Sequence, residues 1–232
     1  MSERYLKSRS IILVARYSLP EEEAMAITAS VRLAPRIATL VLALASLLVL
    51  PGCWVFSVEP LYEENLAHPD TDLEFDQNLV GSWWHADEEC PWTLAVSVHQ
   101  KEAAYDLTET AGPECKTGEG EKRVVQYEGH VVKLDNDRFL DINPKSADVC
   151  DLCLPLHNFF LISQQNDTLA LTPVDSDWLN KAMAQGKITL AHLDGNGLTL
   201  TASSKDLKAF VRRYAGDKAA FKPDSSTTFK RK

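Results

Sequence analysis

The feature that most restricts the fold of this chain is a series of short segments in which apolar and polar residues alternate. Residues 92–98, 104–108 and 124–134 alternate with period two, the pattern of strands with one buried face. Gly129 interrupts the last of these, and we expect a bulge or bend there. Three hairpin-like units follow, with turns rich in Asn, Asp and Gly, at 131–142, 158–171 and 188–201.

Two short helices are expected between and after these hairpins. Ser176 opens the first, which reaches about Gln185, and Ser203 caps the second, which reaches about Ala215. Gly186 and Gly216 follow them as natural stops. The sequence therefore predicts a mainly β fold (α+β class), an antiparallel meander that curls or closes into a barrel, with two short helices.

Outside the domain expected at residues 76–221, the chain has three segments of different character. Residues 53–75 are acidic and lack a sustained period, so we expect a spacer there. Residues 222–232 end in a basic run and are expected to be a disordered tail. Residues 37–50 are apolar and uncharged, and they are short for a membrane span, which needs roughly 20 residues.

Arg32 and Arg36 precede this apolar run, and Leu50-Pro51-Gly52-Cys53 follows it. The pattern resembles the signal peptide and lipobox of bacterial lipoproteins. The resemblance implies that residues 1–52 are a signal peptide, with Met25 as an alternative start. It also implies that Cys53 carries diacylglycerol and acyl chains, the only cofactor expected. The rival interpretation is an uncleaved span from residue 37 to about 56.

The residue after Cys53 is Trp54 and not the Asp that favours inner-membrane retention in such proteins. By this resemblance we expect a cell-envelope protein, anchored by lipid in the outer membrane and facing the periplasm. Two or three acyl chains would hold it there firmly, since each buried methylene contributes roughly 0.8 kcal/mol.

Gly81-Ser82-Trp83 resembles the Gly-x-Trp entry of lipocalin-type barrels, in which a short turn leads into the first strand. The resemblance implies a lipocalin-like β domain in which Trp83 plugs one end of the barrel. Lipocalins also place an Arg from near the last strand over this Trp, and only Arg212 or Arg213 follows residues 198–202 closely enough. The stretches 138–142, 154–159 and 177–179 are similar to a family of uncharacterised bacterial lipoproteins.

Four further cysteines, Cys90, Cys115, Cys150 and Cys153, are expected to form disulfides in an oxidising compartment. Three pairings are open, and Cys90–Cys115 is favoured because these residues flank the hairpin of residues 92–108. An alternative uses Cys150-x-x-Cys153 and His157 as a redox or metal site, although a fourth zinc ligand is missing.

Charge and motifs limit the function. The formal net charge is −9, and the acidic excess lies after residue 52, so binding to nucleic acid is not expected. No recognisable catalytic motif occurs, and the tryptophans Trp83, Trp84 and Trp92 are expected in the core. We therefore expect a non-enzymatic binding or structural module for an apolar small molecule or an envelope protein. The alternatives are the redox or metal protein and an enzyme with a dispersed site.

Overall fold

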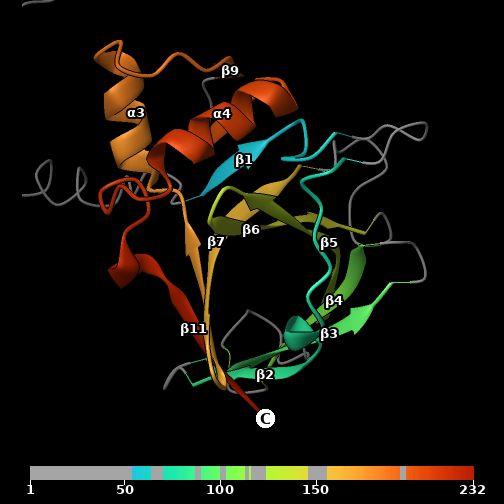
Figure 1. Ribbon diagram of the computed structural model, residues 1–232. Helices are drawn as coiled ribbons and strands as arrows, with labels where there is room; N and C mark the ends of the chain where they lie inside the picture. Colours follow the sequence, from blue (N-terminus) through green and yellow to red (C-terminus); the bar gives the residue numbers. More distant parts are fainter. Residues whose placement is uncertain are drawn as a thin grey trace, which may run out of the picture. The chain divides into compact units, whose positions relative to one another are not determined.

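Eight antiparallel strands of the computed structural model close into a barrel (Figure 1). Their order around the ring is β11-β2-β3-β4-β5-β6-β7-β8, so the last strand pairs with the first and with the seventh. Their bounds are β2 Gly81–His85, β3 Trp92–Val98, β4 Ala104–Ala111, β5 Val124–Leu134, β6 Asp137–Pro144, β7 Asn158–Gln165, β8 Thr168–Pro173 and β11 Thr227–Arg231. The expectation of a mainly β fold with two short helices is confirmed.

The structure describes residues 54–63, 70–86, 90–99, 103–112, 115, 124–145, 156–193 and 197–232. These residues belong to one compact unit, Pro51–Lys232. The expected signal peptide, Cys53, Cys150 and Cys153 lie outside the described residues, so the predictions made for them stay predictions.

A second, smaller sheet lies beside the barrel with the two helices. Its strands are β1 (Val55–Ser57), β10 (Leu198–Leu200) and β9 (His192–Leu193), in the order β1-β10-β9. The third expected hairpin therefore forms, but it pairs with β1 and not with the meander. The helices α3 (Ser176–Ala184) and α4 (Ser204–Tyr214) begin after the caps Asp175 and Ser203, whose side chains accept backbone N–H groups of the first turn.

Alternation along the strands divides the apolar residues between two cores. Side chains that face into the barrel form one buried cluster, which includes Trp83, Tyr105 and Phe229. Side chains on the outer face of β5, β6 and β7 form the other, together with α3, α4 and the small sheet. Figure 1 shows both helices and β1 outside the same part of the ring. The barrel interior is thus occupied by the protein's own side chains.

The structure differs from the expected domain boundaries at both ends. Within the expected spacer, β1 is a strand and Leu61 and Tyr62 are buried, because apolar side chains there pack on the outer core. Within the expected tail, β11 pairs with β2 and β8, because Phe229 faces the interior and is fully buried. The folded domain therefore extends beyond residues 76–221 in both directions.

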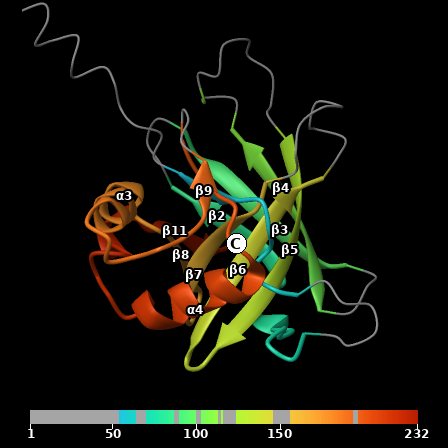
Figure 2. The ribbon, with the colours of Figure 1, turned by 90° about the horizontal axis from the view of Figure 1, so that it is seen from above.

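The two ends of the barrel differ in what surrounds them. At one end lie the short helix η1 (Gln77–Leu79) and the tight turns at 135–136 and 166–167, and we call this the η1 end. The strands β3, β5, β7 and β11 begin at the opposite end, which we call the far end. In Figure 2 the η1 end lies at the bottom of the barrel and the far end at the top. Another short helix, η3 (Pro223–Ser225), leads into β11.

Candidate binding cleft

A polar cleft of about 760 Å³ opens at the η1 end of the barrel. Four segments supply its lining: the entry to η1, the start of β6, the β7–β8 hairpin and the end of β11. Its side chains are amides, carboxylates and guanidinium groups, namely Asp76, Gln77, Asn78, Arg138, Gln164, Asn166, Asp167 and Arg231. Residues from distant parts of the sequence therefore meet at this end because the barrel closes.

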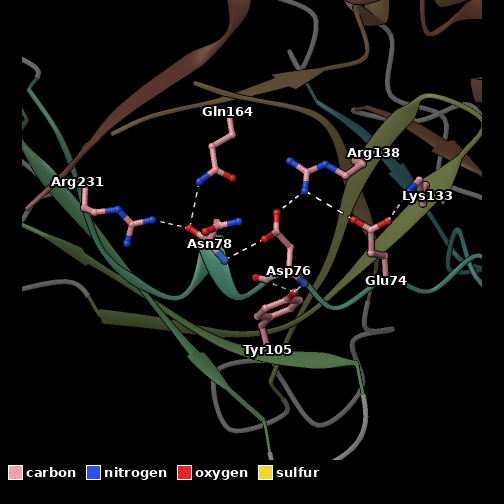
Figure 3. A network of polar contacts seen from close by, with 8 residues as sticks. All are labelled: Glu74, Asp76, Asn78, Tyr105, Lys133, Arg138, Gln164 and Arg231. Carbon is pink, nitrogen blue, oxygen red and sulfur yellow. Dashed lines mark hydrogen bonds and ion pairs between the residues drawn. The ribbon is translucent and has the colours of Figure 1, made fainter. Parts of the chain in front are cut away.

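Asp76 organises one side of the cleft (Figure 3). Its carboxylate accepts the backbone N–H of Asn78 at 2.9 Å and a hydrogen bond from Arg138, which also lies 3.8 Å from Glu74. Its backbone N–H donates to the hydroxyl of Tyr105 at 2.6 Å. Burial acts to raise the pKa of Asp76, but the hydrogen bonds from Asn78 and Arg138 outweigh burial and hold the pKa below its usual value. The carboxylate is thus ionised and fixed in position.

Arg231 organises the other side of the cleft. Its guanidinium lies 4.2 Å from the ring centroid of Trp83 and donates to the carbonyl oxygen of Val80 at 3.0 Å. It also donates to the carbonyl oxygen of Asn78, which accepts a second bond from Nε2 of Gln164 at 3.0 Å (Figure 3). These bonds fix η1 across the end of the barrel.

Trp83 itself is fully buried in the interior cluster, and its Nε1 donates to the carbonyl oxygen of Leu79 at 2.8 Å. The Arg above it comes from β11 and not from the two residues suggested by the resemblance. Arg212 contacts Asp72 at 3.1 Å, and Arg213 lies over Tyr214. Arg231 could not be identified from the sequence, because β11 has only five residues and a single buried apolar side chain, Phe229. Such a short segment shows no recognisable strand pattern.

Gly81 is needed in the Gly-x-Trp segment for two reasons. Its φ of 141° lies in a region that side-chain-bearing residues rarely adopt. A Cβ atom there would also lie 2.7 Å from Nη1 of Arg231. The sequence pattern indicated this segment, whereas its contact with Arg231 forms only when the barrel closes.

The chemistry of the cleft is that of polar recognition without net charge. Its two guanidinium groups are balanced by two carboxylates, and four amide side chains lie among them. Amides both donate and accept hydrogen bonds, whereas guanidinium groups only donate and carboxylates only accept. The lining therefore suits a ligand that offers donors and acceptors together.

The disulfide Cys90–Cys115 is present, as favoured by the sequence. It joins the segments that flank β3 and β4 at the far end of the barrel. Trp92 is half-buried beside the interior cluster, but Trp84 is exposed, so the expectation that all three tryptophans fill the core is wrong for Trp84. Trp84 points outward because the strand alternates and Trp83 takes the inward position.

His157, the third residue of the alternative redox or metal site, has a structural neighbourhood in the described part of the chain. Its Nδ1 lies 2.6 Å from Oδ1 of the buried Asp141, whose Oδ2 accepts the backbone N–H of Leu61 at 2.6 Å. His157 and Ser57 also exchange two backbone hydrogen bonds, at 2.8 and 2.9 Å. These contacts fasten the segment after β1 to β6 and to the chain entering β7.

Ser57, Asp141 and His157 have the composition of a nucleophile, an acid and a base, but their environment does not suit catalysis. All three are buried, and among the described residues the hydroxyl of Ser57 has no hydrogen-bond partner, so it is not paired with His157. A nucleophilic serine needs such a base within reach and access for a substrate.

The residues that the structure describes contain no group of three or more His, Cys, Asp or Glu side chains placed to hold a metal ion. No helix among them has the length and apolar character needed to cross a bilayer. Comparison of the whole chain with protein-family models, curated proteins and solved structures found no match.

Proposed function

We propose that this chain is a lipid-anchored, non-enzymatic binding module of a bacterial cell envelope that holds a neutral polar ligand at the η1 end of its barrel. The observation that supports the binding role is the lining of the cleft, which is made of hydrogen-bonding side chains and carries no net charge. The lipobox resemblance of Leu50-Pro51-Gly52-Cys53 supports the anchor, and Trp54 after it favours the outer membrane, facing the periplasm.

The ligand proposed from the structure differs from the apolar one expected from the sequence. The barrel interior is occupied by a buried apolar cluster, and the cleft beside it is polar. Hydroxyl groups donate and accept at once, so a saccharide matches amides, carboxylates and guanidinium groups placed side by side. Among envelope components we therefore favour a segment of glycan.

The cleft is also preorganised for binding. The hydrogen bonds of Asp76, Arg138 and Arg231 fix its walls, so little conformational entropy is lost when a ligand orders them. Gln164 is exposed enough to contact a ligand, and only its amide nitrogen is bound to Asn78. It is the side chain on which the test is best placed.

The test has two arms. Mass analysis of the native protein should find acyl chains on Cys53 at a new N-terminus. NMR titration with soluble cell-wall oligosaccharides should shift the amide signals of Gln77, Asn78 and Gln164 saturably. Loss of one neutral hydrogen bond costs about 1 kcal/mol, so Gln164→Ala should weaken binding roughly fivefold.

Asp135→Asn is the matched control, because Asp135 lies in the β5–β6 turn at the same end but outside the cleft lining. Its φ is 59°, which Asn tolerates. Binding that is equally strong in Gln164→Ala and wild type, or shifts confined to other surfaces, would reject the cleft as the ligand site.

A further inference from the structure

We propose that the outer face of β2 beside the cleft is a second saccharide subsite, in which a sugar ring stacks on the exposed Trp84. This inference rests on the proposed function and assigns a longer glycan to the same site. One part of the glycan lies in the cleft, and the part that follows passes over the end of β11 to Trp84.

The register of the sheet places Trp84 close to the cleft. Trp84 lies directly opposite Lys230, the residue before the cleft-lining Arg231. On the other side of β11, Lys230 lies opposite Thr168, the residue after the cleft-lining Asp167. Neighbouring strands are about 4.8 Å apart, so Thr168 and Trp84 are separated across β11 by about 10 Å. A glycan that extends from the cleft by a few sugar rings would cover this span.

The side chain of Trp84 points away from the barrel interior and is open to a ligand. Trp83 and Phe229 face inward and are fully buried, so alternation along the strands directs Trp84 and Lys230 outward. Trp84 is 42% exposed. The helices and the small sheet pack on the outer face of β5, β6 and β7, and in Figure 1 β2 lies on the side of the ring opposite to α4.

The rim between the cleft and Trp84 is polar. The side chain of Asp167 is 83% exposed, and its carboxylate lies 3.8 Å from Nε of Arg231. The backbone N–H of Arg231 donates to the carbonyl oxygen of Asp167 at 2.8 Å, which fixes the rim. A glycan that leaves the cleft here would meet this carboxylate, then the hydroxyl of Thr168 and the ammonium group of Lys230, and then the ring of Trp84. Hydrogen-bonding groups therefore follow one another along the whole path.

The surroundings of Trp84 on this face favour a sugar over an apolar partner. Its cross-strand neighbours are Lys230 and Thr93, and Ser82 and Thr228 lie two residues along the same strands. A single ring among hydroxyl and ammonium groups offers less apolar area than the continuous patch that a protein or a lipid surface buries. A pyranose has C–H groups on its faces and hydroxyl groups at its edge. It can therefore stack on the indole while its hydroxyls bond to Lys230 and Thr93.

The test compares a cell-wall disaccharide with a longer oligosaccharide of the same repeat in NMR titrations of the full chain. Both should shift the amide signals of Gln77 and Asn78 in the cleft. Only the longer one should also shift the indole N–H signal of Trp84. Stacking on one exposed aromatic ring should make the longer oligosaccharide bind about fivefold more tightly than the disaccharide.

Trp84→Ala should lose this fivefold gain and leave the affinity for the disaccharide unchanged. Trp84→Tyr keeps an aromatic face and should retain most of the gain. Trp54→Ala is the matched control, because Trp54 is 47% exposed but packs against Phe160, which pairs with the last residue of β8, Pro173, and not with Thr168 beside the cleft. This control should bind both saccharides as the wild type does.

The outcomes separate this inference from the proposed function. If both saccharides shift the cleft signals and bind equally tightly while the Trp84 signal stays in place, the subsite is overturned and the proposed function stands. If neither saccharide shifts the cleft signals, the proposed function fails and the subsite fails with it. A Trp84 signal that responds only to lipid vesicles or to protein concentration also overturns the subsite, as does an equal loss of affinity for both saccharides in Trp84→Ala. The wild-type titration needs no substitution, so a variant that misfolds does not remove the test.

Discussion

At the scale of single residues, Gly129 lies where the barrel interior has no room for a side chain. The sequence suggested a bulge or bend there, but Gly129 pairs with Tyr105 and Ile142 in ladders that run without an extra residue. The predicted bulge is therefore absent. Glycine occupies this position because of side-chain packing. A Cβ atom on Gly129 would lie 2.4 Å from Cδ1 of Leu107 and 3.4 Å from Cδ1 of Leu140. Glycine is needed so that these leucines can fill the interior.

Gly129→Ala is therefore expected to destabilise the fold. Leu107 is buried, so an added methyl group forces it from its position, and overpacking of this kind costs about 1–3 kcal/mol. Urea unfolding followed by tryptophan fluorescence would measure the loss. Gly197→Ala is the control, because a Cβ atom there meets nothing within 4 Å. Equal midpoints for the two variants would show that the interior has more space than the structure indicates.

At the scale of elements, a buried ion cluster joins the segment before η1 to α4. Lys208 of α4 contacts both Asp70 and Asp72, and Arg212 contacts Asp72. The side chains of Lys208 and Asp70 are only 8% and 5% exposed. Asp70 also accepts the backbone N–H groups of Glu63 and Asp72, at 2.7 and 2.9 Å. The acidic residues expected to be a solvated spacer thus fasten this segment to the domain.

Sequence reasoning could not have found this cluster, since Lys208 and Asp70 are separated by 138 positions. Acidic residues without an apolar period look like a solvated spacer until their distant partner is known. The helix itself was predictable, because its cap and its apolar face lie within a few residues of each other.

Lys208→Met is expected to cost about 3–5 kcal/mol at neutral pH, because it leaves the buried Asp70 without its counter-charge. Burial acts to raise the pKa of Asp70, but its hydrogen bonds to Lys208 and to backbone N–H groups outweigh burial and lower the pKa from 3.8. A lowered folded-state pKa gives stability above pH 3.8 that is lost as the pH falls through the folded value. The difference between wild type and Lys208→Met should therefore shrink in strong acid.

Chemical unfolding of both proteins at pH 7 and at successively lower pH would measure this difference. At alkaline pH the contribution of Lys208 to stability changes in the opposite direction, falling as the pH rises. Burial acts to lower the pKa of Lys208, but its bonds to Asp70 and Asp72 raise it above 10.5. Its contribution is complete below pH 10.5 and is lost only as the pH rises through the folded value. A difference that stays constant into strong acid would mean that the Asp70–Lys208 pair does not stabilise the fold.

At the scale of the whole molecule, the sequence predicted the strands and turns but not how the barrel closes. Alternation and turn residues are local, so the meander from β3 to β8 was recognisable. Closure depends on β11, whose residues Thr227–Arg231 resemble a basic tail, with Phe229 alone facing inward. The candidate site was likewise only partly predictable from the sequence. Trp83 was identified from its Gly-x-Trp segment, whereas Arg138, Gln164 and Arg231 come together only when the barrel closes.

Removal of β11 tests whether this strand is what closes the barrel. A chain that ends at Ser226 loses the pairing of β11 with β2 and β8, the buried Phe229 and the guanidinium above Trp83. Two strand edges would then be exposed, which favours aggregation. We expect the truncated chain to bind hydrophobic dyes and to lose cooperative thermal unfolding.

Phe229→Ala separates closure from simple loss of apolar packing. This variant keeps the backbone of β11 and its pairing, and loss of a buried Phe should cost about 3–5 kcal/mol while unfolding stays cooperative. Hydrogen exchange should then show protected amides in β2 and β8 for Phe229→Ala but not for the truncated chain. If the truncated chain kept wild-type protection in both strands, the barrel would be stable as an open sheet. The cleft would then need another explanation, because Arg231 and the carbonyl oxygens that it holds depend on closure.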